Sequence, residues 1–263
     1  MRCKWMVLGI VVLAVTLWIT GCGRYMDRLA YREYMGVLTP VDQEEENPQK
    51  TITDDGEILF EQERLEIGLR PMTDEELNRQ FPSATAQGRN PYTFGDTKWF
   101  RYDEVPQRFT VFRLTVKNYQ YPKVFIDPTD VQLISDNGRV YHSLTREQLY
   151  VYFRTFATGG RSADGAGERF GNEYHDWQER MSILRRTRFA PEFIFSGQER
   201  DGFLVFEPLH GDVSNITVNV PEVQVRFDYR DVPIETLAVT ARFHRDTGRL
   251  YPDGELKLTY EVR

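Results

Sequence analysis

RFTVFRLTVKN, residues 108–118, is the stretch that decides the fold of this chain. Apolar and polar residues alternate along it, so that Phe112, Leu114 and Val116 share one face of a strand while Arg, Thr and Lys side chains take the other. A period of two with one polar face is typical of an antiparallel sheet that packs on one side and meets water on the other. The stretch therefore predicts a strand of a half-buried β-sheet.

The same alternation recurs along the rest of the chain. Further strand-like runs lie at residues 216–220, 223–229, 237–243 and 256–262. The phase shifts by one residue at Pro221 and Glu222, which predicts a bulge or a tight turn there. Together these runs predict a mainly β fold, an antiparallel β-sandwich over residues 57–263.

Two segments add detail to this sandwich. Residues 131–135 and 139–144 flank Asp136-Asn137-Gly138, and this tripeptide predicts a hairpin because Asn and Gly accept positive φ. The run GFLVFE, residues 202–207, is apolar on both faces and predicts a central strand.

Helices interrupt the sandwich. Thr73 to Glu76 and Thr145 to Gln148 have the spacing of capping boxes, which predicts that a helix begins at each. An apolar stripe predicts a further helix over 172–187. We therefore expect a helical excursion between sandwich strands at about 145–196.

The N-terminus has the pattern of an export signal. Arg2 and Lys4 precede an uncharged apolar run, which ends at Ile19-Thr20-Gly21-Cys22. This tetrapeptide resembles the lipobox of bacterial lipoproteins. The resemblance implies that residues 1–21 are a signal peptide cut between Gly21 and Cys22, and that Cys22 is acylated and holds the protein on a lipid bilayer. An uncleaved membrane anchor is the alternative, although the apolar run is short for a spanning helix.

Charge and cysteine content exclude several classes of function. The only cysteines are Cys3 and Cys22, so a processed chain has no free thiol for catalysis or for a zinc or iron–sulfur site. Without residues 1–21 the chain has 31 basic and 40 acidic residues, a net charge of −9. Such an acidic chain is not expected to bind nucleic acid through its phosphates.

Residues 22–56 are expected to form a tether. Arg24, Arg28 and Arg32 are spaced to share one face of a short helix over 24–34, which could meet anionic head groups or simply face water. Residues 37–57 are rich in acids and Pro, the composition of a linker. We expect this acidic linker to hold the folded part away from the membrane.

The β-rich body resembles the immunoglobulin-like sandwich domains of exported bacterial lipoproteins. The likeness covers roughly 97–144 and 190–244 and includes FSGQERDGFLVFEP, with glycines at 197 and 202. It implies an immunoglobulin-like antiparallel β-sandwich in the cell envelope. Such families are mostly uncharacterised or act as binding modules, so the likeness implies location and architecture more than activity. The Cys-Trp-Cys framework of antibody domains is lacking.

The sequence offers no catalytic residues, metal site or cofactor site. Its histidines, at 142, 175, 210 and 244, have no paired spacing, and residues 159–167 are Gly-rich without the ending of a phosphate-binding loop. Aspartates at 127, 130 and 136 do not have EF-hand spacing, so turn roles are preferred to calcium binding. No serine lies in a GxSxG elbow.

Aromatic residues of the excursion are the candidate partner contacts. Tyr150, Tyr152, Tyr174 and Trp177 would suit a protein or glycan surface if their rings are exposed, or they would pack the excursion onto the sandwich. We therefore expect a non-enzymatic lipid-anchored binding or scaffolding module, whose partner is an envelope protein or glycan. An envelope hydrolase and a small-ligand or metal carrier, with a site assembled across loops, are the alternatives.

The residue after the lipobox bears on the location. In Gram-negative lipoproteins an Asp after the lipidated Cys commonly retains the protein in the inner membrane, and here that residue is Gly23. The resemblance therefore implies the outer membrane, with the body in the periplasm or at the cell surface.

Overall fold

The structure is a computed structural model that describes residues 31–41, 49–95, 106–159 and 170–259. The described residues divide into two compact units: the larger lies within Leu38–His244, and the smaller is formed by residues 31–37 with residues 245–259. The predicted signal peptide, the predicted lipobox with Cys22, and all of the Gly-rich segment except Gly159 lie outside the described residues.

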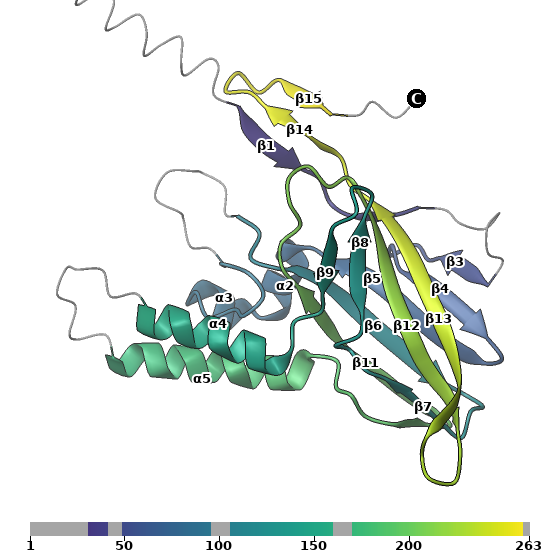
Figure 1. Ribbon diagram of the computed structural model, residues 1–263. Helices are drawn as coiled ribbons and strands as arrows, with labels where there is room; N and C mark the ends of the chain where they lie inside the picture. Colours follow the sequence, from purple (N-terminus) through teal and green to yellow (C-terminus); the bar gives the residue numbers. More distant parts are fainter. Residues whose placement is uncertain (1–30, 42–48, 96–105, 160–169, 260–263) are drawn as a thin grey trace, which may run out of the picture. The chain divides into compact units, whose positions relative to one another are not determined.

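The larger unit is an antiparallel β-sandwich (Figure 1). One layer, the β12 sheet, has the strand order β10-β7-β12-β13-β2, with β8 paired to β12 and β9 paired to β8. Its strands are β2 (Thr39–Pro40), β7 (Lys123–Ile126), β8 (Gln132–Ser135), β9 (Val140–His142), β10 (Ile194–Phe195), β12 (Asn215–Phe227) and β13 (Pro233–His244).

The other layer, the β6 sheet, has the strand order β11-β6-β5-β4-β3. Its strands are β3 (Lys50–Ile52), β4 (Ile58–Gln62), β5 (Leu65–Met72), β6 (Thr110–Asn118) and β11 (Gln198–Phe206). Every named strand pair in both sheets is antiparallel.

The predicted alternation places the core between the two sheets. Phe112 of β6 is fully buried and packs edge-on against Phe243 of β13, with 5.2 Å between ring centroids, and against Phe206 of β11 at 6.2 Å. Val223 and Val225 of β12 are buried as predicted. Tyr229 is 86% exposed, because β12 ends at Phe227 and the residue lies in the following turn.

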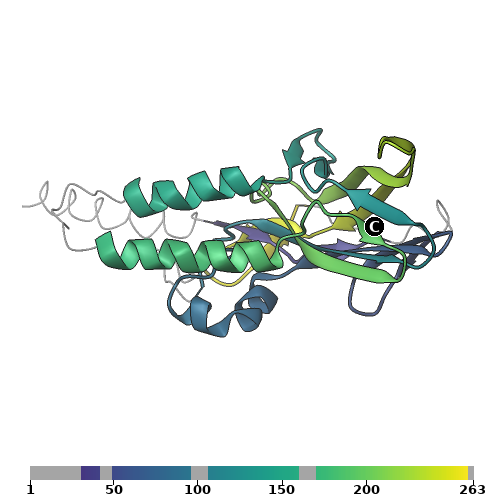
Figure 2. The ribbon, with the colours of Figure 1, turned by 90° about the horizontal axis from the view of Figure 1, so that it is seen from below.

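The outer face of the β6 sheet has a second core, formed with the helices. These are α2 (Asp74–Gln80), α3 (Pro82–Ala86), α4 (Arg146–Gly159) and α5 (Phe170–Thr187). Phe203 and Val205 alternate with Leu204 and Phe206, and the first pair packs among residues of the helices while the second pair faces the sandwich core. The helical excursion is therefore confirmed, with α4 and α5 side by side (Figure 2).

β11 corrects one prediction. It pairs only with β6 among the named strands, at the edge of its sheet, and is not a central strand. Its apolar run is buried on both faces because the sandwich covers one and the helices cover the other. At the edge of β11 that pairs with no named strand, Phe189 N donates to Phe203 O at 3.1 Å.

Several local predictions are confirmed. The hairpin β8–β9 turns at Gly138, whose φ is +81°, and the register of β12 against β13 shifts between Val220 and Val223. Thr73 and Glu76 form a complete capping box at α2. At the start of α4, Thr145 N donates to the Gln148 side chain at 2.7 Å, and Gln148 N donates to Thr145 Oγ1 at 3.1 Å.

The predictions for the tether are corrected where the chain is described. Residues Arg32–Met35 form a strand, β1, where a helix over 24–34 was expected. The acidic linker predicted over 37–57 contains β2 and β3, each of which pairs at an edge of the sandwich. The partners of β1 and β2, which are β14 and β13, are distant in sequence, and their pairing outweighs the local pattern, whereas β3 forms a hairpin with β4.

The smaller unit has its own antiparallel sheet. β1 pairs with β14 (Thr247–Leu250), which pairs with β15 (Leu256–Leu258). The strand expected over 256–262 therefore belongs to this sheet and not to the sandwich, and its Leu256 and Leu258 are exposed. The Arg249 guanidinium lies 4.4 Å from the centre of the Tyr31 ring.

Candidate binding sites

Three of the four candidate aromatic residues come together on the paired helices. Tyr150 of α4 meets Trp177 of α5 edge-on at a centroid distance of 5.2 Å, and Tyr174 stacks on Trp177 at 5.8 Å. The Tyr174 residue is 57% exposed and Tyr150 is 38% exposed. We call these three residues the aromatic surface.

Tyr152 does not belong to the aromatic surface. Two residues along a helix are about 200° apart, so Tyr152 faces away from Tyr150. Its ring packs against Phe109 at 5.0 Å, and burial raises the pKa of its hydroxyl. For Tyr152 the alternative therefore holds: its ring packs the excursion onto the sandwich.

A cleft of about 760 Å³ adjoins the aromatic surface, and we call it the helical cleft. Tyr150 and Trp177 line it, together with apolar side chains that include Met181, Phe189 and Pro191. Its charged lining consists of Arg146, Arg185, Arg188 and Glu147. Its volume lies within the range of small-molecule and peptide side-chain sites.

Buried donors lie in the wall of the helical cleft. Arg188 donates to Leu144 O at 2.6 Å, and burial lowers the pKa of its guanidinium. Trp177 Nε1 is buried and has no hydrogen-bond acceptor among the described residues. This indole N–H therefore has one interaction to gain if the helices shift or a ligand binds.

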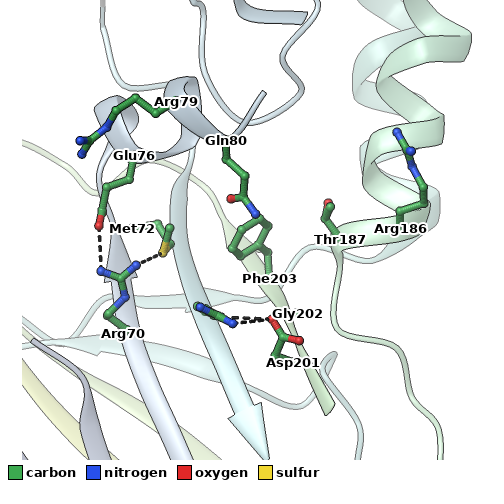
Figure 3. Close-up of a pocket in the computed structure, with 11 residues that line it drawn as sticks. Arg70, Met72, Glu76, Arg79, Gln80, Arg186, Thr187, Asp201, Gly202 and Phe203 are labelled. Carbon is green, nitrogen blue, oxygen red and sulfur yellow. Dashed lines mark hydrogen bonds and ion pairs between the residues drawn. The ribbon is translucent and has the colours of Figure 1, made fainter. Parts of the chain in front are cut away.

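A second pocket, of about 500 Å³, was not found from the sequence (Figure 3). We call it the arginine pocket. Arg70 of β5 and Arg113 of β6 are direct cross-strand neighbours on the outer face of the β6 sheet. Arg70 Nη1 donates to Glu76 Oε1 at 2.7 Å, and Arg113 Nη2 donates to Asp201 Oδ2 at 2.9 Å.

Two more arginines line the arginine pocket from the helices. Arg79 lies in the last turn of α2 and Arg186 in the last turn of α5, positions where a cation interacts favourably with the helix dipole. Neither forms an ion pair with a carboxylate of the described residues. The pocket was missed because its arginines come from four elements whose contact no local spacing indicates.

Asp74 carries a half-buried carboxyl group at the start of α2. Burial raises its pKa from 3.8 to about 6, and the nearby Arg108 guanidinium opposes that rise. Arg108 is itself buried, donates to Asn90 O at 2.9 Å and lies 4.1 Å from the centre of the Phe94 ring. Asp74 lines neither the helical cleft nor the arginine pocket.

The histidines and aspartates occupy separate local environments. His210 Nδ1 bonds with the Tyr141 hydroxyl at 2.8 Å, and His244 Nδ1 bonds with Asn215 Oδ1 at 2.8 Å. Asp127 accepts from Thr129 N at 2.8 Å in an Asx turn. Within the described ranges, no three His, Cys, Asp or Glu residues gather as metal ligands would.

Comparison with known proteins gives little. No family model and no curated protein matches the chain. A solved structure, that of the secreted protein MPT63 of Mycobacterium tuberculosis, aligns at 10% identity with a TM-score of 0.28, over 64% of this chain and 88% of that one. With a score this low, the fold is argued from the strand order and the function from the pockets.

Of the helices in the described part of the chain, none is both long enough and apolar enough to cross a bilayer.

Proposed function

We propose that this chain is a lipid-anchored envelope protein that acts as a non-enzymatic binding or scaffolding module. The observation that carries the proposal is the aromatic surface beside the helical cleft, in which the exposed residues Tyr150 and Tyr174 both pack against the half-buried Trp177. Its partner is an envelope protein or a glycan, and the sandwich serves as the rigid support for the two helices.

Large amphipathic rings favour this use. Tyr and Trp contribute much contact area at a low cost in side-chain entropy, and they dominate the binding energy of many interfaces. The Tyr174 residue is 57% exposed, and its ring stacks on Trp177. A partner would therefore meet a ring that is already ordered.

The alternative functions have less support. A hydrolase needs a carboxylate that is free to act as an acid or a base, yet Glu76 and Asp201 of the arginine pocket are each held by an arginine. A His-based metal carrier would need imidazoles that converge. Such a cluster is not found among the described residues.

The anchor is proposed from the lipobox. Cys22 carries the lipid after cleavage between Gly21 and Cys22, and because Gly23 stands where an Asp would retain the protein in the inner membrane, transfer to the outer membrane is the default. Cys22→Ala should abolish incorporation of labelled palmitate and leave the chain uncleaved. Unchanged labelling would refute the anchor. Separation of the two membranes on a density gradient tests the destination, and recovery only with the inner membrane would refute it.

The binding surface can be tested with matched tyrosines. Tyr150→Ser with Tyr174→Ser should reduce the envelope material isolated with the native protein at least tenfold, because the exposed rings are lost. Tyr119→Ser with Tyr229→Ser is the control, since Tyr119 and Tyr229 are also exposed but lie away from α4 and α5. Equal loss in both double variants, or no loss in the first, would refute the proposed surface.

A further inference from the structure

We propose that the arginine pocket binds a small organic anion through a carboxylate or phosphate group. This site is separate from the aromatic surface, and its argument does not rest on the proposed envelope partner. The pocket has four arginines and two carboxylates among its described lining residues, in a chain whose overall charge is −7.

The placement of Arg70 and Arg113 costs free energy. They are directly opposite in the β5–β6 register, and like charges in that position are destabilising. Each is held by a carboxylate from a different element, Glu76 of α2 and Asp201 of β11. The network therefore orders two guanidinium groups side by side on the sheet.

The ordered arginines keep donors for a ligand. Arg113 bonds to Asp201 through Nε and Nη2, and its Nη1 donates to no acceptor among the described residues. Its side chain is 43% exposed. Because a guanidinium presents five N–H donors in a planar fork, Arg113 can hold Asp201 and still donate to an oxyanion.

The rim of the pocket adds positive charge and an amide. Arg79 of α2 and Arg186 of α5 lie on opposite sides of it, and Gln80 points toward Phe203 between them (Figure 3). The dipoles of the two helix C-termini offset part of this charge, and Asp55 lies 4.0 Å from Arg70 Nε, so among the described residues the positive charge without a carboxylate partner is that of Arg79 and Arg186. Met72 and Phe203 offer an apolar wall for the carbon part of a ligand.

The size and donors of the pocket set the class of ligand. A volume of about 500 Å³ accommodates a small organic molecule. Arginine binds carboxylate and phosphate in the same bidentate geometry, so both sources of an oxyanion fit the pocket. We expect a compact anion with an apolar portion.

The test is calorimetric titration of the full acylated chain in detergent with succinate and with inorganic phosphate, each at constant ionic strength against sodium chloride. Succinate or phosphate should bind with a stoichiometry of one. Binding of one and not the other identifies the oxyanion. Heats no different from those of chloride for both probes would overturn the proposal.

Arg185 and Arg186, adjacent residues of α5, provide a matched control. Arg79→Gln with Arg186→Gln should weaken binding at least tenfold, and Arg186→Gln alone should also weaken it, whereas Arg185→Gln removes one charge as Arg186→Gln does, one residue away in the helical cleft, and should leave binding unchanged. Equal weakening in both would indicate only overall charge and overturn the site. The variant with serine at 150 and 174 should bind the anion normally, so failure of the envelope-partner proposal is distinguishable from failure of this one.

Discussion

Asp74 illustrates at the scale of one residue how burial works against a charge. Its carboxyl group starts α2, where the helix dipole favours a negative charge, but desolvation is the larger effect and raises its pKa to about 6. The folded state therefore binds this proton more tightly than the unfolded state. The stability that the protonated form contributes is complete below about pH 4, and it is lost as the pH rises through 6.

Asp74→Asn should remove this pH dependence. Between pH 4 and 7 the free energy of unfolding of the variant should rise relative to the native chain, by up to about 3 kcal/mol, since one pKa unit corresponds to about 1.4 kcal/mol. Urea denaturation at several pH values measures the difference. If the free energy of unfolding depends on pH in the same way in both proteins, burial does not raise the pKa of Asp74.

β11 shows at the scale of an element what local patterns can and cannot reveal. Its alternation and its apolar run predict a strand, and both are correct. Burial of Phe203 and Val205 on the outer face comes from the helices, whereas that of Leu204 and Phe206 comes from the sandwich. The sequence pattern indicates that both faces of the strand are buried, but it does not indicate what covers each face. The edge position of β11 could therefore not be predicted.

The edge of β11 that pairs with no named strand lies against the backbone of residues 188–189, which leads to a prediction about Gly202. A Cβ on Gly202 would lie 2.5 Å from Phe189 N and 2.6 Å from its Cα, and this backbone cannot move aside easily. Gly202→Ala should therefore destabilise the protein by about 1–3 kcal/mol, as overpacking does. The measurement is the midpoint of urea unfolding.

Gly68 on β5 is the matched control. A Cβ there would meet only the end of the Glu57 side chain, which can rotate away. Gly68→Ala should change the stability by less than about 0.5 kcal/mol. If Gly202→Ala is tolerated equally well, the close approach of residues 188–189 to β11 is not present in solution.

At the scale of the whole molecule, the sequence predicts the layers better than the sites. The sandwich, the hairpin at Gly138 and the helix over 172–187 follow from local patterns. The pairing of Tyr174 with Trp177 also follows, because they are three residues apart on one helix. The arginine pocket does not, since it depends on how β5, β6, α2 and α5 pack together.

The proposed function requires that the aromatic surface contacts a partner in the envelope. A photo-crosslinking amino acid placed at 150 or 174 in the full lipidated chain, and activated in native membranes, tests it most directly. We predict the same discrete adduct from both positions, and none from 119 or 229, where exposed tyrosines lie away from the helices. Adducts of equal yield at all four positions, or none at 150 and 174, would contradict the account.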